Sequence, residues 1–226
     1  MIVMLGFVVN SFTVSTIEVV GNKRIESADL ENQIMGENDT RKTIAIMFNE
    51  IFGKHKDIPN VANYKLNILS PTHLQIVVEE NPIIGCIFYM SNFMYFDKTG
   101  LVSYSKTYSE QGVPIVEGIS FRNVVIGQKL EVRNKNEFNK LADIARAMQN
   151  TDVQVDNITF KGENDITIRL GRIYVLLGDA KNIEIQANII SEVYPQLQGK
   201  AGTLDLSEAR ENMINESYIF KKDSGR

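Results

Sequence analysis

The chain has 226 residues, of which 23% are charged and 43% are hydrophobic, and its formal net charge is −4. This composition suits one large or two small globular domains, and it excludes disordered, collagen-like and disulfide-rich chains. The acidic balance argues against nucleic-acid binding. One cysteine and two histidines leave little material for a metal centre or for histidine-based catalysis. Composition therefore favours a binding or scaffolding protein.

The first nine residues (MIVMLGFVV) are almost wholly apolar. A helix of this length would cover roughly 13 Å, which is under half of the hydrocarbon core of a bilayer. The stretch has neither the basic start nor the small-residue cleavage site of a signal peptide. Local sequence leaves two interpretations open, a buried first strand or the outer end of a transmembrane helix.

The segment that follows, up to residue 80, predicts the order strand, helix, helix, strand, strand. Apolar and polar residues alternate through residues 12–20, and a short helix follows with Ser27 as its expected N-cap. Residues 64–68 and 74–78 alternate in the same way and are predicted to form a hairpin. In the second helix, apolar residues spaced i, i+3, i+4, i+7 and i+8 form one continuous face. These residues are Ile44, Met47, Phe48, Ile51 and Phe52.

After Asn81-Pro82 the pattern becomes rich in short strands, and the chain is expected to start a second domain there. Helices are predicted at residues 136–149 and 181–194, and a three-stranded antiparallel meander lies between them. The predicted strands are residues 83–90, 93–96, 101–104, 113–116, 153–160, 166–170, 173–177, 203–206 and 217–220. The remaining residues, 221–226, are interpreted as a polar tail.

Residues 97–100 (DKTG) match the start of the phosphorylated-aspartate loop of P-type ATPases. That chemistry needs a threonine after the glycine and further aspartates that hold magnesium. Here Leu101 follows Gly100, and no matching magnesium-binding loop is present. The motif is instead expected to be the turn of a hairpin, in which Gly100 supplies a positive φ.

The other reactive side chains give no enzyme signal either. His55 and His73 lie in polar loop or turn sequences without an obvious carboxylate or serine partner. Cys86 lies in an apolar strand, where a free cysteine is usually a small buried hydrophobe. Glu79 and Glu80 end a predicted strand and are expected to be solvated.

The C-terminal residues 217–221 (SYIFK) have two interpretations. A late strand in an antiparallel meander tends to fall at the edge of the sheet, where its backbone groups are unpaired. In the first interpretation, Lys221 and Lys222 keep this edge from pairing with the strand of another chain. Alternatively, the edge accepts a strand from a partner protein by β-augmentation.

Six segments in this order and spacing resemble the FtsQ/DivIB family of bacterial cell-division proteins. Residues 12–22 look like the opening strand of a POTRA (polypeptide-transport-associated) domain, and 74–84 (LQIVVEENPII) like the strand and Glu-x-x-Pro junction that follow it. The other four are residues 95–102 (YFDKTGLV), 113–118 (VPIVEG), 175–181 (VLLGDAK) and 202–206 (GTLDL).

The resemblance implies an α+β protein with a POTRA domain (βααββ) at residues 12–81. A mixed α/β domain with an extended antiparallel sheet would follow at residues 82–220, the β domain of the family. Residues 1–11 would be the outer end of a truncated transmembrane helix. The chain would then be a single-pass protein of the cell membrane at the division septum, with its bulk extracytoplasmic.

By the same resemblance, the protein is a non-enzymatic scaffold without metal, cofactor, nucleic-acid or small-molecule partners. It would bind the bitopic division proteins FtsL and FtsB/DivIC by strand addition at its last strand. The residues expected to bind are Ser217, Tyr218, Ile219, Phe220 and Lys221, with Tyr194 of the preceding helix. Two alternatives stay open, a POTRA-type chaperone of polypeptide export or assembly and a small hydrolase with an unrecognised site.

Overall fold

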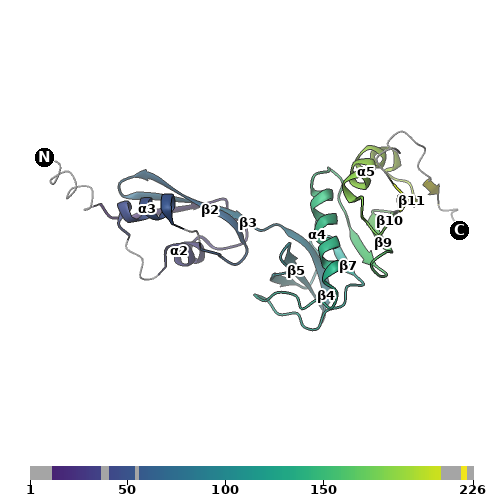
Figure 1. Ribbon diagram of the computed structural model, residues 1–226, viewed down its shortest axis with the longest axis horizontal. Coiled ribbons are helices and arrows are strands. Elements are labelled where there is room, and N and C mark those ends of the chain that lie inside the picture. Colours follow the sequence, from purple (N-terminus) through teal and green to yellow (C-terminus); the bar gives the residue numbers. More distant parts are fainter. Residues whose placement is uncertain (1–11, 37–40, 54–55, 210–219, 223–226) are drawn as a thin grey trace. The chain divides into compact units, whose positions relative to one another are not determined.

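The computed structural model describes residues 12–36, 41–53, 56–209 and 220–222. The chain divides into two compact units, Met1–Asn81 and Pro82–Arg226. The fold class is α+β, with four helices and twelve strands in the described ranges (Figure 1). Each unit has its own hydrophobic core.

The first unit contains a three-stranded sheet and two helices. Its elements are β1 (Thr16–Val20), α2 (Ser27–Met35), α3 (Thr43–Phe52), β2 (Val61–Ser70) and β3 (His73–Glu80). The predicted order of strand, helix, helix, strand, strand is confirmed. The sheet order is β1-β3-β2, in which β1 runs parallel to β3 and β2 pairs with β3 as an antiparallel hairpin.

The two helices of this unit bury unequal faces. Leu30 and Ile34 of α2 are buried in a core with Leu74 and Ile76 of β3. In α3, by contrast, Ile46 is the buried residue, and the face predicted from the apolar spacing is largely exposed.

The predicted N-cap of α2 is wrong. Ser27 is the first helical residue, Glu26 holds the N-cap position, and no side chain caps the helix there. The Ser27 hydroxyl instead faces Asn22, whose side-chain Nδ2 donates to Ser27 Oγ at 3.2 Å and to the Ile25 carbonyl at 2.8 Å. The Ser27 hydroxyl therefore accepts a hydrogen bond from the turn before the helix instead of capping the helix.

Glu80 is also placed differently from the prediction. Its side chain is 4% exposed, and its carboxylate accepts the backbone N–H groups of Lys23, Arg24 and Ile25. Arg24 Nε lies 2.8 Å from Glu80 Oε2. Burial acts to raise the pKa of Glu80, but the backbone hydrogen bonds and Arg24 outweigh it and lower the pKa to about 2. Glu80 thus ties the end of β3 to the turn before α2.

The second unit is built on a nine-stranded sheet of order β12-β11-β10-β9-β8-β7-β4-β5-β6. Its strands are β4 (Ile83–Tyr89), β5 (Asn92–Asp97), β6 (Val102–Lys106), β7 (Ile115–Glu117), β8 (Asn157–Phe160), β9 (Ile166–Leu170), β10 (Ile173–Gly178), β11 (Gly202–Asp205) and β12 (Phe220–Lys222). Its helices are α4 (Lys135–Gln149) and α5 (Ile183–Leu197). The predicted antiparallel meander is confirmed as β8-β9-β10.

The expected extended antiparallel sheet is wrong, because the sheet is mixed. Three pairs are parallel, namely β4 with β7, β7 with β8, and β10 with β11. Parallel neighbours need a crossover connection, and the chain supplies α4 between β7 and β8 and α5 between β10 and β11.

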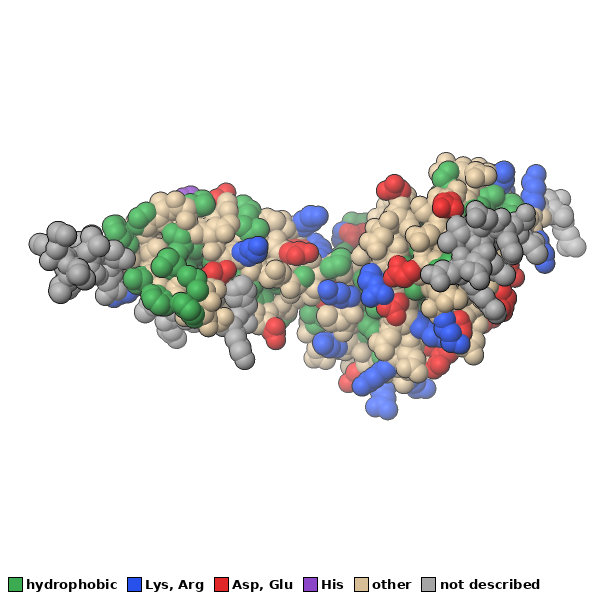
Figure 2. Space-filling model, turned by 45° about the horizontal axis from the view of Figure 1, so that its top comes forward, with side chains coloured by type: hydrophobic (Ala, Val, Ile, Leu, Met, Phe, Trp, Pro, Cys, Tyr) green, Lys and Arg blue, Asp and Glu red, His purple; other side chains and the backbone are tan. Residues whose placement is uncertain are grey.

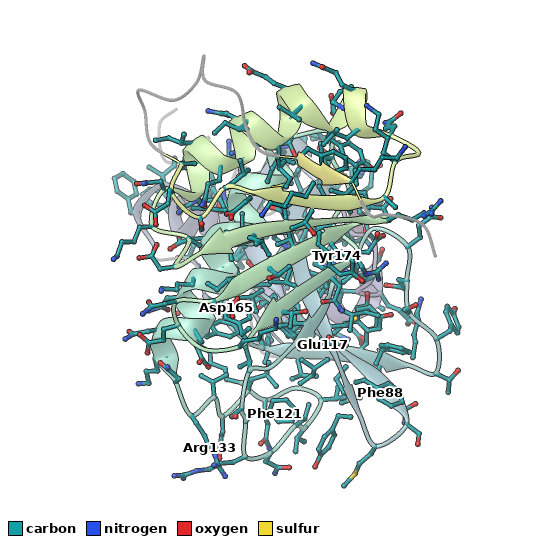
Figure 3. All side chains as sticks on the ribbon, turned by 90° about the vertical axis from the view of Figure 1, so that its right-hand side faces the viewer. Phe88, Glu117, Phe121, Arg133, Asp165 and Tyr174 are labelled. Carbon is teal, nitrogen blue, oxygen red and sulfur yellow. The ribbon has the colours of Figure 1, made fainter. Side chains whose placement is uncertain are left out.

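In the part of the sheet formed by β8, β9 and β10, one face is buried and the other is open. Along β9 and β10 the burial alternates, so Ile173 and Val175 lie in the core while Tyr174 between them is 48% exposed. Leu141 and Ile144 of α4 and Ile190 of α5 share that core. The register places Glu117 of β7 on the same face as Tyr174, and both are labelled in Figure 3.

The DKTG segment is a hairpin turn, as predicted. Gly100 has φ +81° and donates its N–H to the Asp97 carbonyl at 2.9 Å. Asp97 Oδ1 accepts the N–H groups of Thr99 and Leu101 and the Thr99 hydroxyl. The aspartate is fully buried, and it orders the turn between β5 and β6.

Candidate functional site

Strand β12 forms one edge of the nine-stranded sheet. It pairs with β11 in antiparallel register, with Phe220 opposite Leu204, Lys221 opposite Thr203 and Lys222 opposite Gly202. In the described part of the chain no strand pairs with its other side. Such an edge presents unpaired backbone groups to a partner.

Of the predicted last strand, residues 217–220, the structure describes Phe220. The described strand continues from Phe220 to Lys222, so it enters the segment interpreted as a polar tail. Of the predicted binding residues, Phe220 and Lys221 belong to it. Ser217, Tyr218 and Ile219 lie outside the described residues, and their role stays a prediction.

Gly202 allows β12 to lie close to β11. A Cβ atom at this position would clash with the Lys221 carbonyl oxygen and would stand 2.7 Å from the ring of Phe220. The Lys221 carbonyl therefore faces β11. Because N–H and C=O groups alternate sides along an antiparallel strand, those of Phe220 and Lys222 point to the open edge.

The side chains of β12 fall on both faces of the sheet. Phe220 is partly buried and packs against the core of the unit. Lys221 is exposed, and the register aligns it with Thr203 of β11 and Tyr174 of β10 on the open face. The edge thus presents an aromatic and a basic side chain beside its free backbone groups. The apolar spacing in the sequence did not indicate that Tyr174 would lie on the same face as Lys221, or that Gly202 would lie against β12.

Tyr194 lies on α5, is partly buried, and packs against the same core as Phe220.

The turn before α5 is ordered by Asp179, whose carboxylate accepts hydrogen bonds from the side chain and the backbone N–H of Lys181. These hydrogen bonds, that of the Lys181 side chain first, lower the pKa of Asp179. Gly178, at φ +63°, makes the preceding turn against Ser207.

Gln186 of α5 is a residue that sequence reasoning missed. It is 2% exposed, and its amide Nε2 donates to the carbonyls of Leu177 and Leu206, each at 2.9 Å. Leu177 belongs to β10, and Leu206 directly follows β11. Gln186 therefore connects the end of β10 to the residue that follows β11. β11 is the strand with which β12 pairs.

Of the residues weighed for catalysis, the structure describes the surroundings of His73 and Cys86. His73 Nε2 lies 4.0 Å from Glu18 Oε2, a carboxylate neighbour that the sequence pattern did not indicate, and His55 lies outside the described residues. Cys86 is fully buried. Burial, and secondarily the charge of Glu110, raises the pKa of Cys86 to about 12.

Neither metal ligands nor a membrane span is found in the part of the chain that the structure describes. Within those residues, no three His, Cys, Asp or Glu side chains are grouped to hold a metal ion. Within the same residues, every helix is too short or too polar to cross a bilayer.

Comparison with known proteins adds no assignment. No protein-family model matches the chain, and no curated protein matches it. The sheet edge formed by β12 is therefore interpreted from its own geometry and from the sequence motifs.

Proposed function

We propose that this chain is a cell-division scaffold of the FtsQ/DivIB type, held at the bacterial cell membrane with both units outside the cytoplasm. It acts at the septum without catalysis, by binding the bitopic proteins FtsL and FtsB/DivIC. The observation that carries the proposal is the open edge at β12, at the end of the chain where the family resemblance locates the partner contact.

The first unit supports this proposal through its order of elements. A POTRA domain is expected to read βααββ, and the unit has this order in a sheet of order β1-β3-β2. Within the Glu-x-x-Pro junction of segment 74–84, which begins at Glu79, the next residue has a defined structural role. Glu80 anchors the turn before α2, and Pro82 begins the second unit.

The glycines in the resembling segments of the second unit support it as well. Gly100 adopts a positive φ in the β5–β6 turn, and Gly178 does so before α5. Gly202 allows the close approach of β12 to β11. At each of these positions another residue would be strained or would clash. The glycines of the resembling segments are therefore required by the backbone conformation at these positions.

The proposed contact is the addition of a partner strand to β12. Main-chain bonds to Phe220 and Lys222 supply affinity, and side chains on alternate positions supply specificity. Lys221 and Tyr174 on the open face favour a partner strand that carries acidic or aromatic residues on that side. Phe220 stays in the core and holds the edge in place.

The test compares two substitutions at one residue in co-purification with the extracytoplasmic parts of FtsL- and DivIC-type proteins from the same organism. Lys222→Pro removes an outward N–H group, so it should abolish the complex. Lys222→Ala removes the charge but keeps the backbone, so its complex should persist. A Lys222→Pro variant that co-purifies like the unchanged chain would refute strand addition at β12.

A second substitution tests the predicted role in partner binding of Ser217, Tyr218 and Ile219, which lie outside the described residues. Replacing Tyr218 with a charged residue is expected to abolish partner binding while circular dichroism shows an unchanged fold. Retained binding would limit the contact to Phe220–Lys222 and to the open face of the sheet.

A further inference from the structure

Helix α3 of the first unit exposes an apolar face. Met47, Phe48, Ile51 and Phe52 are 45%, 55%, 62% and 77% exposed. The rings of Phe48 and Phe52 stack with centroids 5.8 Å apart, so they form a continuous apolar surface rather than isolated side chains. Figure 2 shows hydrophobic side chains gathered on the surface of this unit. Contiguous exposed apolar residues of this kind mark contact with a protein or a membrane.

The charges around this face are complementary to an anionic surface. Residues 41–56 (RKTIAIMFNEIFGKHK) contain four Lys or Arg and one acidic residue, Glu50, whereas the whole chain has a net charge of −4. Arg41 and Lys42 directly precede α3 and are exposed, and Arg41 also forms an ion pair with Glu31 of α2 at 3.0 Å. Glu50 is partly buried and accepts the backbone N–H of Leu66 at 3.3 Å, so it is engaged within the unit. Apolar residues flanked by basic ones are typical of helices that lie in a membrane interface.

The first residue of α3 is hydrogen-bonded to Phe12, which lies three residues after the apolar N-terminal sequence. The Phe12 carbonyl accepts the backbone N–H of Thr43 at 3.2 Å and its hydroxyl at 3.4 Å, at the first residue of α3. Residues 10 and 11 separate Phe12 from the apolar residues 1–9, so residue 9 is three residues away from this contact. Three residues span at most about 10 Å. If residues 1–9 enter a bilayer, α3 is therefore held at its surface.

We propose that the apolar face of α3 lies on the surface of an anionic phospholipid bilayer, with Phe48 and Phe52 inserted at the level of the headgroups. The inference adds a lipid contact to the proposed function and rests on its membrane attachment, not on its partner contact. The basic flanks and the short connection to residues 1–9 favour lipid over a protein partner. The bilayer contact would fix the first unit against the membrane.

The absence of tryptophan from the chain allows a direct test. Phe52→Trp places the sole tryptophan of the chain on the α3 face, and Phe88→Trp is its matched control on β4, where Phe88 is 60% exposed in another aromatic pair. The full chain is mixed with vesicles of phosphatidylcholine alone or with phosphatidylglycerol. Vesicle binding is measured by flotation, and lipid contact by the emission maximum and by quenching with lipids brominated in the acyl chain.

With phosphatidylglycerol vesicles we expect the Phe52→Trp emission to shift to the blue and to be quenched severalfold. The Phe88→Trp emission should not change, and the Phe52→Trp effect should weaken on phosphatidylcholine alone. A chain that floats with vesicles while Phe52→Trp stays unquenched would overturn the α3 contact and leave membrane attachment intact. A chain that does not float would overturn both.

Two further outcomes would replace lipid with another occupant. Blue-shifted Phe52→Trp emission without vesicles, at every protein concentration, would mean that another part of this chain covers the face. The same shift appearing only as concentration rises would mean that a second copy covers it. Either result overturns the lipid contact.

Discussion

Helices α3 and α4 carry similar apolar periodicity but have different surroundings. In α4, Leu141 and Ile144 are fully buried and Met148 is 5% exposed. In α3, Ile46 is buried while Ile51 is 62% and Phe52 is 77% exposed. An amphipathic pattern therefore defines the face of a helix without determining whether that face meets a core.

The width of the underlying sheet explains the difference. Strands lie about 4.8 Å apart, so three strands span about 10 Å, which is close to the diameter of one helix. In the first unit α2 packs on β1 and α3 on β2, and the sheet is too narrow to cover both apolar faces. Nine strands span roughly 40 Å by the same spacing, which leaves room for α4 and α5 on one face.

The largest effect is expected from one substitution made in both helices. Ile144→Ala should destabilise the second unit by roughly 2–5 kcal/mol, because it leaves a cavity in a closed core. Ile51→Ala should change the stability of the first unit by less than about 0.5 kcal/mol, because the side chain is mostly in solvent. Hydrogen exchange, resolved to peptides of each unit, measures both effects.

Cys86 provides an independent readout for that comparison. It is the sole cysteine of the chain, and it is buried in the second unit. With its pKa raised to about 12, the thiol should resist alkylation at neutral pH until this unit opens. Ile144→Ala should speed alkylation and Ile51→Ala should not. Equal rates in the two variants would refute the contrast between the helices.

A smaller effect is expected from pH, and it should concern the first unit. The pKa of Glu80 is about 2 in the folded chain against an ordinary value of 4.5. A lowered pKa contributes stability that is present above pH 4.5 and is lost as the pH falls from 4.5 towards 2, by about 3 kcal/mol. Glu80→Gln should be less stable at neutral pH and should lose this part of the acid dependence. An unchanged acid profile in that variant would contradict the role given to Glu80.

Among the substitutions expected to destabilise the chain, the smallest effect is expected at the sheet edge. Gly202→Ala should displace β12 from β11 and cost about 1–2 kcal/mol locally, while the central strands remain protected. Faster hydrogen exchange at Phe220–Lys222, with loss of partner binding, is the expected result. Thr203→Ala is the control, since Thr203 is next in the strand but its side chain lies on the open face. Equal protection in both variants would show that β12 does not depend on Gly202.

Much of the secondary structure could be predicted because its signals are local. The alternation in β2 and β3, the apolar spacing of α3 and α4, and the DKTG turn each depend on a few neighbouring residues. The prediction for Ser27 failed because a local alternative competes with capping: the Asn22 side chain, five residues earlier, donates to the Ser27 hydroxyl. The prediction for Glu80 failed because its partners, the backbone N–H groups of residues 23–25, are distant in the sequence.

The candidate edge was predictable in kind, whereas its extension to Lys222 and its surroundings were not. A late strand with aromatic and basic residues indicated an edge, and β12 forms one over the described residues Phe220–Lys222. Its support by Gln186 and its alignment with Tyr174 come from residues distant in sequence. Such contacts leave no local pattern to read.

The sequence by itself determined the order of the elements, the apolar faces of the helices and the places where glycine makes a turn. These properties follow from the period of the backbone and from allowed backbone angles, which neighbouring residues control. Only the tertiary structure decided that the large sheet is mixed, that α3 keeps its apolar face exposed and that the carboxylate of Glu80 is engaged by the turn before α2. These outcomes depend on which strands pair and on how much sheet area is available to cover each helix, and both are set by contacts between distant parts of the chain.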